Sequence, residues 1–263
     1  MRILQIVAPG ASEYERKCQR VDREALAPKH EVLTASLDDA RGVHADVAHV
    51  YASGELPAAA FVKFPTPYVS SVSMKRSRWP WRRAAEPGRV VTPLGELPEA
   101  VEERYWAAPG SGPSRNVIGS FARPSVRNMV DQTLTRIHRF RDDVSWTLFD
   151  RVPEPQDLVS VDIWVDPAVD DRDFDGFVAE AVVSGLPVVA ARTAINEIRM
   201  EKGRTGALVP PRDPNEMTHA ILTALFKPEV ARSKQNAARQ TVSKFRARQR
   251  LRVLSHLYET LIQ

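Results

Sequence analysis

The side chain best suited to binding chemistry is Glu180, in the stretch DGFVAEAVVSGLPVVAARTAINEIRMEKGRTGALVPP of residues 175–211. An ionised carboxylate accepts several hydrogen bonds, so it suits the hydroxyls of a sugar or a ribose. Asp173 and Asp175 precede it and could cap a helix, whose unpaired amides would attract a diphosphate. We therefore expect Glu180 to contact a nucleotide; a solvated position on the helix is the alternative.

A second candidate is the basic aromatic run KRSRWPWRR, residues 75–83. Tryptophans flanked by arginines suit an anionic membrane surface or a phosphorylated lipid, which makes Arg78, Trp79, Trp81 and Arg82 candidates for an acceptor or membrane surface. The same residues could stack on nucleic acid. They could also be a surface loop in which arginine stems cover the tryptophans. The overall pattern of elements does not favour nucleic acid.

Composition excludes several kinds of site. The single cysteine, Cys18, excludes an internal disulfide and a thiolate zinc site, and the six histidines lack the spacing of a helical metal site. His49 ends an apolar run, where a packed histidine is commoner than a catalytic one. A formal net charge of +4 favours an anionic partner such as a nucleotide. We expect no protein-held metal and no cofactor beyond a nucleotide substrate.

The first residues, MRILQIVAPG, predict a buried strand rather than a secretory signal. The most apolar stretch, 177–191, is broken by Gly185 and Pro187, short of the ~20 residues that span a bilayer. We expect a cytoplasmic protein, with any membrane contact peripheral and on the inner surface.

The elements that must position these residues alternate between strand and helix. In the first half we expect strands at 3–7, 31–34, 47–51, 68–72 and 89–92, and helices from Ser12, at 56–64 and at 99–105. Ser12 and Glu15 have the spacing of a capping box. Such alternation is typical of βαβ units with a parallel sheet.

Residues 107–113, AAPGSGP, are the clearest linker, and a second alternating series follows. In it we expect strands at 116–121, 145–149, 162–165 and 188–191, helices at 126–140 and 215–225, and only a loop between 149 and 162. Gly185 should end the helix that carries Glu180, and Gly203 with Gly206 should form a hairpin. A last helix follows, and we expect its arginines at 246, 248, 250 and 252 to form a solvated face.

The run EAVVSGLPVVA, then NEI, then GRTGALVPPRDPNEMTHAI resembles the donor-binding domain of retaining GT-B glycosyltransferases, called glycosyl transferases group 1 or family 4. The resemblance is strongest over 174–225. The closing FRARQRLRVLSHLYETLIQ is similar to the family's last helix, and MRILQIV and DVAHVY are similar to pieces of its N-terminal domain.

The resemblance implies two Rossmann-like domains that bind a nucleotide-diphosphate sugar between them, without a metal. Glu180 matches the second glutamate of the family's paired-glutamate motif, which contacts the ribose; Arg172 stands where the first is expected. Arg123 matches the diphosphate-binding arginine, and Arg127 could replace the family's lysine. Glu197 matches the family's Pro-Glu glutamate, and Asp175 is a further donor-binding candidate.

The expected organisation is a Rossmann-like acceptor-side domain at 1–109, a nucleotide-sugar-binding domain at 114–242 and a helix at 243–263 that packs back on the first domain. The function implied is transfer of a sugar, with retention and without metal, to an acceptor such as a lipid-linked or polysaccharide chain. The alternative is a catalytically inactive binding or assembly module with this fold, because the first glutamate, a glycine pair and a histidine of the family are missing.

Overall fold

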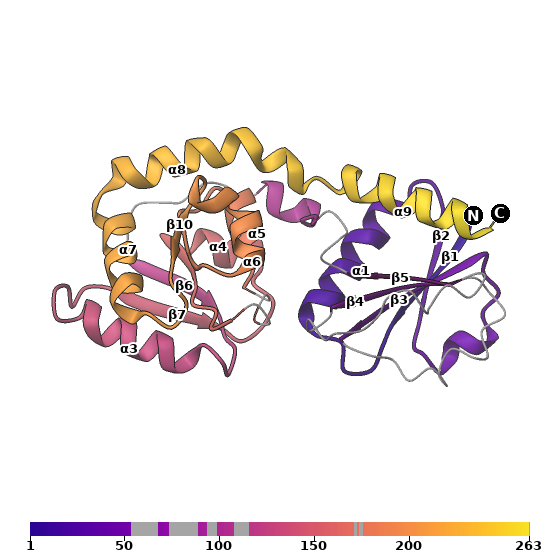
Figure 1. The fold of residues 1–263 in the computed structure, drawn as a ribbon, viewed down its shortest axis with the longest axis horizontal. Helices are drawn as coiled ribbons and strands as arrows, with labels where there is room; N and C mark the ends of the chain where they lie inside the picture. Colours follow the sequence, from indigo (N-terminus) through magenta and orange to yellow (C-terminus); the bar gives the residue numbers. More distant parts are fainter. Residues whose placement is uncertain are drawn as a thin grey trace. The chain divides into compact units, whose positions relative to one another are not determined.

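The computed structural model describes residues 1–53, 68–73, 89–93, 99–107, 116–170, 173 and 176–262. The chain divides into two compact units, Met1–Glu102 with Lys244–Gln263, and Glu103–Ser243. Each unit is an α/β layer built on a five-stranded parallel sheet, which confirms the expected fold class (Figure 1). None of the described helices is long and apolar enough to cross a membrane.

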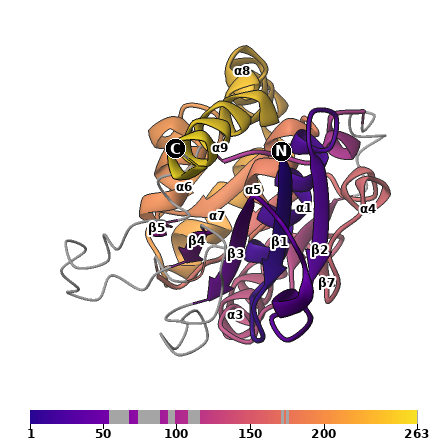
Figure 2. The same ribbon diagram turned by 90° about the vertical axis from the view of Figure 1, so that its right-hand side faces the viewer.

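In the first unit the sheet has the order β2-β1-β3-β4-β5 (Figure 2). Its strands are β1 Arg2–Val7, β2 Glu31–Ala35, β3 Val47–Ser53, β4 Tyr68–Ser73 and β5 Arg89–Pro93, and its helices are α1 Glu13–Leu26, η1 Asp39–Gly42 and α9 Ala247–Ile262. The strand predictions are confirmed, and Ser12 and Glu15 form the predicted capping box at the start of α1. The helix predicted at 56–64 lies outside the described residues.

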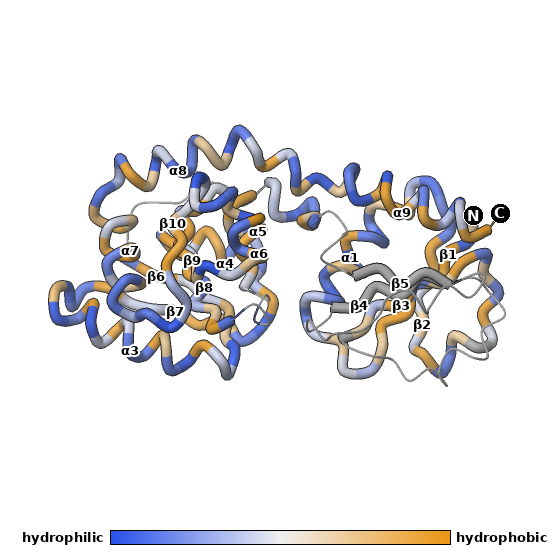
Figure 3. Tube along the Cα trace, viewed as in Figure 1, coloured by the Kyte–Doolittle hydropathy of each residue, from blue (hydrophilic) through white to orange (hydrophobic). Residues whose placement is uncertain are grey.

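Apolar and polar side chains alternate along β1 and β3, so one face of the sheet is apolar there and the other is polar. Leu4, Ile6, Ala48 and Val50 form one core cluster, and the hydropathy colouring marks this apolar character along β1 (Figure 3). The residues between them, Gln5, His49 and Tyr51, are also buried, but they join a polar network with α1 and α9. Helix α9 packs on α1, as expected of the closing helix.

Two predictions for this unit are wrong. Residues 99–102 are not helical, and only the 3-10 helix η4, Glu103–Ala107, follows them. The physical reason is that the Val101 N–H donates to the Phe245 carbonyl, a tertiary partner, instead of a helical one. The second correction concerns Arg250, which is only 2% exposed rather than part of a solvated face, because Asp22 pairs with it.

In the second unit the sheet has the order β10-β9-β8-β6-β7, with every neighbouring pair parallel. Its strands are β6 Val117–Phe121, β7 Ser145–Phe149, β8 Ile163–Asp166, β9 Val188–Ala191 and β10 Ala207–Val209. Its helices are α3 Arg127–Ile137, α4 Pro155–Val159, α5 Val178–Val183, α6 Ala194–Arg199, η5 Glu201–Gly203, α7 Pro214–Phe226 and α8 Pro228–Thr241, with the 3-10 turn η6 Val242–Phe245 after them.

Most local predictions for this unit hold. Gly185 has φ +79° after α5, as a left-handed helix end requires. Asp213 caps α7 by accepting from the amides of Asn215 and Glu216. The hairpin at Gly203 and Gly206 is wrong, since β10 runs parallel to β9.

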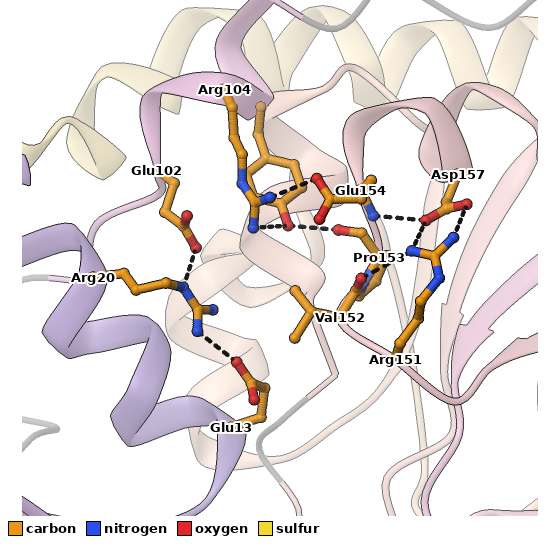
Figure 4. A network of polar contacts seen from close by, with 10 residues as sticks. Glu13, Arg20, Glu102, Arg104, Arg151, Val152, Pro153, Glu154 and Asp157 are labelled. Carbon is orange, nitrogen blue, oxygen red and sulfur yellow. Dashed lines mark hydrogen bonds and ion pairs between the residues drawn. The ribbon is translucent and has the colours of Figure 1, made fainter. Parts of the chain in front are cut away.

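The segment between β7 and β8 is more than a loop, because it contains the short helix α4. Glu154 caps that helix, and Asp157 returns a carboxylate to the Glu154 amide. Figure 4 shows the ion pairs around it, Arg104 with Glu154 and Arg151 with Asp157, and a separate group in the first unit in which Arg20 contacts both Glu13 and Glu102. The predicted linker 107–113 lies outside the described residues except for Ala107.

Candidate functional site

The candidate site lies at the carboxyl ends of β6 and β8 in the second unit. These strands are neighbours in the sheet. From β6 the chain continues to β7, toward one edge of the sheet, and from β8 it continues to β9, toward the other edge. In open parallel sheets this reversal point creates a crevice outside the strand ends, where ligands bind. Arg123 follows β6 and Asp166 ends β8, so the topology brings both to this place.

Arg123 is held there by two carboxylates. Its Nη2 donates to Asp166 Oδ1 at 2.5 Å, and its Nε lies 3.1 Å from Asp173 Oδ1. The arginine side chain is 9% exposed. Its Nη1 and Nε are buried, and neither makes a hydrogen bond to the residues that the structure describes, so the contact of Nε with Asp173 is an ion pair only. Only Nη2 of the guanidinium therefore makes a hydrogen bond in the described part of the chain.

Asp166 is the centre of the cluster, and the sequence analysis missed it. Its second oxygen accepts from Asn196 Nδ2 at 2.8 Å, and Asn196 is fully buried. A Cβ on Gly176 would lie 2.3 Å from the Asp166 carboxyl carbon, so only glycine leaves room for this carboxylate. The signal was available in the sequence: an aspartate that ends the apolar strand IWVD stands where parallel sheets place ligand-binding side chains.

Asp173 is the less tightly held partner of Arg123. Ser125 Oγ donates to its carboxylate at 2.9 Å. Burial raises the pKa of Asp173, while the Arg123 charge and the Ser125 hydrogen bond oppose that rise. Its side chain is 9% exposed, against 0% for Asp166. Asp166 is therefore the deeper anchor and Asp173 the outer one.

Glu180 lies in the first turn of α5 and is 1% exposed, which contradicts the solvated alternative. The helix has six residues and starts after Phe177, a left-handed residue with φ +51°. Burying a carboxylate on an otherwise apolar helix costs free energy unless polar groups surround it. A glutamate at this position therefore indicates a specific role rather than helix packing.

The remaining predicted donor-binding residues do not join this cluster through any contact in the described part of the chain. Arg127 is the exposed first residue of α3, as its solvated alternative predicts. Glu197 is exposed on α6 and pairs with Arg192 at 3.2 Å. Asp175, and the predicted acceptor or membrane surface at Arg78, Trp79, Trp81 and Arg82, lie outside the described residues.

His49 is a packed core group. It is fully buried, stacks on Tyr51 with ring centroids 4.1 Å apart, and its Nδ1 lies 2.6 Å from the Tyr258 hydroxyl. Burial lowers the pKa of His49 to about 3, so the ring is neutral. The described residues contain no group of three or more His, Cys, Asp or Glu placed to hold a metal ion.

Comparison with known proteins finds a family match within the second unit. The family described as Glycosyl transferases group 1 matches residues 117–226, which contain β6 through α7. No curated protein sequence matches the chain.

Three solved structures are similar over nearly the whole chain. HepE of Anabaena in complex with UDP is 13% identical, covers 99% of this chain and 100% of its own, and has a TM-score of 0.67. Sucrose-phosphate synthase of Thermosynechococcus elongatus is 12% identical over 99% of both chains, with a TM-score of 0.66. AviGT4, a glycosyltransferase involved in avilamycin A biosynthesis, is 15% identical over 100% of this chain and 98% of its own, with a TM-score of 0.63. At these identities the likeness establishes the fold. The chain therefore has the GT-B fold, and its residues 117–226 match the family described as Glycosyl transferases group 1.

Proposed function

We propose that this protein transfers a sugar from a nucleotide-diphosphate donor to an acceptor, with retention and without a metal ion. The observation that carries the proposal is the position of Arg123. It is a buried cation at the reversal point of the sheet in a glycosyl transferases group 1 domain, and its Nη1 lacks an acceptor. A departing diphosphate supplies the oxygen that this nitrogen lacks, and a buried donor contributes more there than in water.

The roles follow from the side chains. Arg123 stabilises the diphosphate, with Arg127 as a second charge at the start of α3, and Glu180 orients the donor through its ribose hydroxyls. Asp175 and Glu197 are further donor-binding residues in this proposal. We assign donor binding to the domain at 114–242 and the acceptor side to 1–109.

Uridine nucleotides are the first donors to test. The related HepE has been crystallised with UDP, with UDP and glucose, and with UDP-glucose. That fact supports a uridine donor here only through shared fold, so GDP and ADP and their sugars belong in the same experiment.

For the acceptor we propose a lipid-linked or polysaccharide chain, met by Arg78, Trp79, Trp81 and Arg82 at the inner membrane surface. Cosedimentation with vesicles of phosphatidylglycerol and phosphatidylcholine tests this. We expect binding that the double change Trp79→Ala and Trp81→Ala removes and that Arg139→Ala, on the exposed surface of the second unit, leaves intact. Equal binding by all three proteins would exclude this surface.

The second candidate function is a binding or assembly module without catalysis. Arg172 replaces the glutamate expected to hold the donor sugar, and Arg123 is already engaged by two carboxylates. Both features reduce the expected affinity for a donor sugar, and neither disturbs the fold.

Calorimetric titration with UDP, GDP, ADP and UDP-glucose tests the first proposal, with Arg123→Met as the site variant and Arg139→Ala as the matched surface control. We expect binding that Arg123→Met weakens and Arg139→Ala does not. Failure of every nucleotide to bind at millimolar concentration would exclude a donor site. Binding of the nucleotide without detectable hydrolysis or transfer of the sugar would favour the module.

A further inference from the structure

Asp166 binds one nitrogen of Arg123 and leaves the other two, Nη1 and Nε, without a hydrogen bond in the described part of the chain. Of the three guanidinium nitrogens, Nη2 donates to Asp166 and Nε faces Asp173. Nη1 is buried without an acceptor in the described part of the chain. A buried donor without an acceptor destabilises a folded protein, a charged donor more than a neutral one, so such groups are rare.

The same carboxylate anchors a second buried group. Asn196 Nδ2 donates to Asp166 Oδ2 and to the Ala191 carbonyl, at 2.8 and 3.1 Å. Two acceptors on one side define which end of the amide is nitrogen, so Oδ1 points the other way. Asn196 Oδ1 likewise has no partner among the described residues. Asp166 thus fixes the orientation of Arg123 and of Asn196, and each of these side chains keeps hydrogen-bonding capacity that no described residue uses.

The two carboxylates around Arg123 differ in how firmly they hold it. Asp166 is completely buried, its contact with Arg123 is the short one, and Gly176 provides the space that it occupies. Asp173 is more exposed, lies farther from the guanidinium and shares its carboxylate with Ser125. A phosphate that competes for Arg123 displaces the outer carboxylate more easily than the inner one.

We propose that Asp166 is a positioning residue that aims Arg123 at a phosphate oxygen of the nucleotide donor, and that Asp173 is an exchangeable partner that the phosphate replaces. This rests on the proposed function. Asp173 lies beside Nε, so a phosphate that replaces it gains Nε as a donor, and Nη1 is the adjacent nitrogen without an acceptor. Asp166 stays in place and keeps the guanidinium plane oriented.

The proposal predicts opposite effects for two chemically identical substitutions. Simple electrostatics predicts that removing either negative charge near a phosphate strengthens binding. If Asp166 positions Arg123, Asp166→Asn instead weakens UDP binding, by about tenfold, which is the magnitude of one charge-assisted hydrogen bond. Asp173→Asn removes a competitor and strengthens UDP binding several-fold.

Calorimetric titration of the wild type and both variants with UDP and with uridine tests this, with thermal unfolding to verify that each variant is folded. Uridine lacks phosphate, so we expect its affinity to be the same in all three proteins. In addition, Arg123→Met with Asp166→Asn should bind UDP no more weakly than Arg123→Met alone, since the aspartate acts through the arginine.

Each outcome decides the matter. If the wild type binds UDP and both asparagine variants bind it more tightly, Asp166 contributes only charge and the positioning role is wrong while the donor site stands. Equal losses for UDP and uridine in Asp166→Asn would show a structural role instead. If Asp166→Asn does not fold, Gly176→Ala, which pushes the carboxylate from its place, must give the selective loss of UDP. Failure of the wild type to bind UDP, GDP or ADP would overturn both the proposed function and this inference.

Discussion

Arg250 on α9 and Asp22 on α1 form a buried ion pair across 228 positions of sequence, with Arg250 Nε and Nη2 donating to the two carboxylate oxygens. Both side chains are at most 2% exposed. The Tyr51 hydroxyl also donates to Asp22, at 2.8 Å, so the pair connects the C-terminal helix to α1 and to β3. It stabilises the first unit only while both partners are present.

We expect Arg250→Met to destabilise the protein by about 3–5 kcal/mol, because Asp22 would be left as an uncompensated buried charge. Urea unfolding followed by circular dichroism measures this. The double change Arg250→Met and Asp22→Asn should recover a large part of the loss, whereas Arg248→Met, at an exposed position of the same helix, should change the free energy of unfolding by less than about 0.5 kcal/mol. A double variant as unstable as the sum of the single ones would show that the two residues are not coupled.

Acid should destabilise the first unit through His49. Its folded pKa is about 3 and its unfolded pKa is near 6.5, so below pH 6.5 the unfolded chain binds a proton that the folded chain does not. The stabilisation is complete above pH 6.5 and falls by about 1.4 kcal/mol per pH unit as the pH drops toward 3. We expect His49 to account for about 2 kcal/mol of lost stability between pH 6.5 and 5.0. Urea titrations at both pH values should show a smaller loss for His49→Asn, because an amide does not titrate in this range. An equal loss would contradict the buried neutral ring.

The single thiol should be inert in the folded protein. Burial raises the pKa of Cys18 to about 11, and the residue is 4% exposed. At pH 8 the thiolate that reacts with disulfide reagents is therefore scarce and covered. We expect Ellman's reagent to modify no thiol within minutes in native buffer and one per chain in guanidinium chloride. Rapid modification of the native protein would mean that α1 is not packed as described.

Gly176→Ala should destabilise the second unit. The added methyl would lie 2.3 Å from the Asp166 carboxyl carbon, and moving that buried carboxylate disturbs its contacts with Arg123 and Asn196. We expect a loss of about 1–3 kcal/mol, the usual cost of overpacking. Gly42→Ala is the control, because no atom lies within 4 Å of the added methyl there, and it should leave the melting temperature unchanged. Equal melting temperatures for both variants would contradict the placement of Asp166.

Local signals in the sequence were enough for most elements. Apolar runs predicted the strands of both sheets, and Ser12, Asp213 and Gly185 marked helix ends by short-range chemistry that needs no tertiary context. The resemblance over residues 174–225 predicted the fold class and the donor-binding region. Errors occurred where a distant segment supplied the partner, as Phe245 does for Val101.

The candidate site was predictable only in part. The sequence by itself determined two parallel α/β layers and the glycosyl transferases group 1 pattern, and it made Arg123 and Glu180 candidates, because periodicity and motif spacing are local properties. Only the tertiary structure decided which groups Arg123 faces. Asp166 lies 43 positions from Arg123, and Asn196 joins the cluster by binding Asp166; they come together because parallel strands place their carboxyl ends at one sheet edge. The same reason applies to Arg250. The helix pattern predicted a solvated side chain, but Asp22, which is distant in sequence, pairs with the guanidinium and allows its burial.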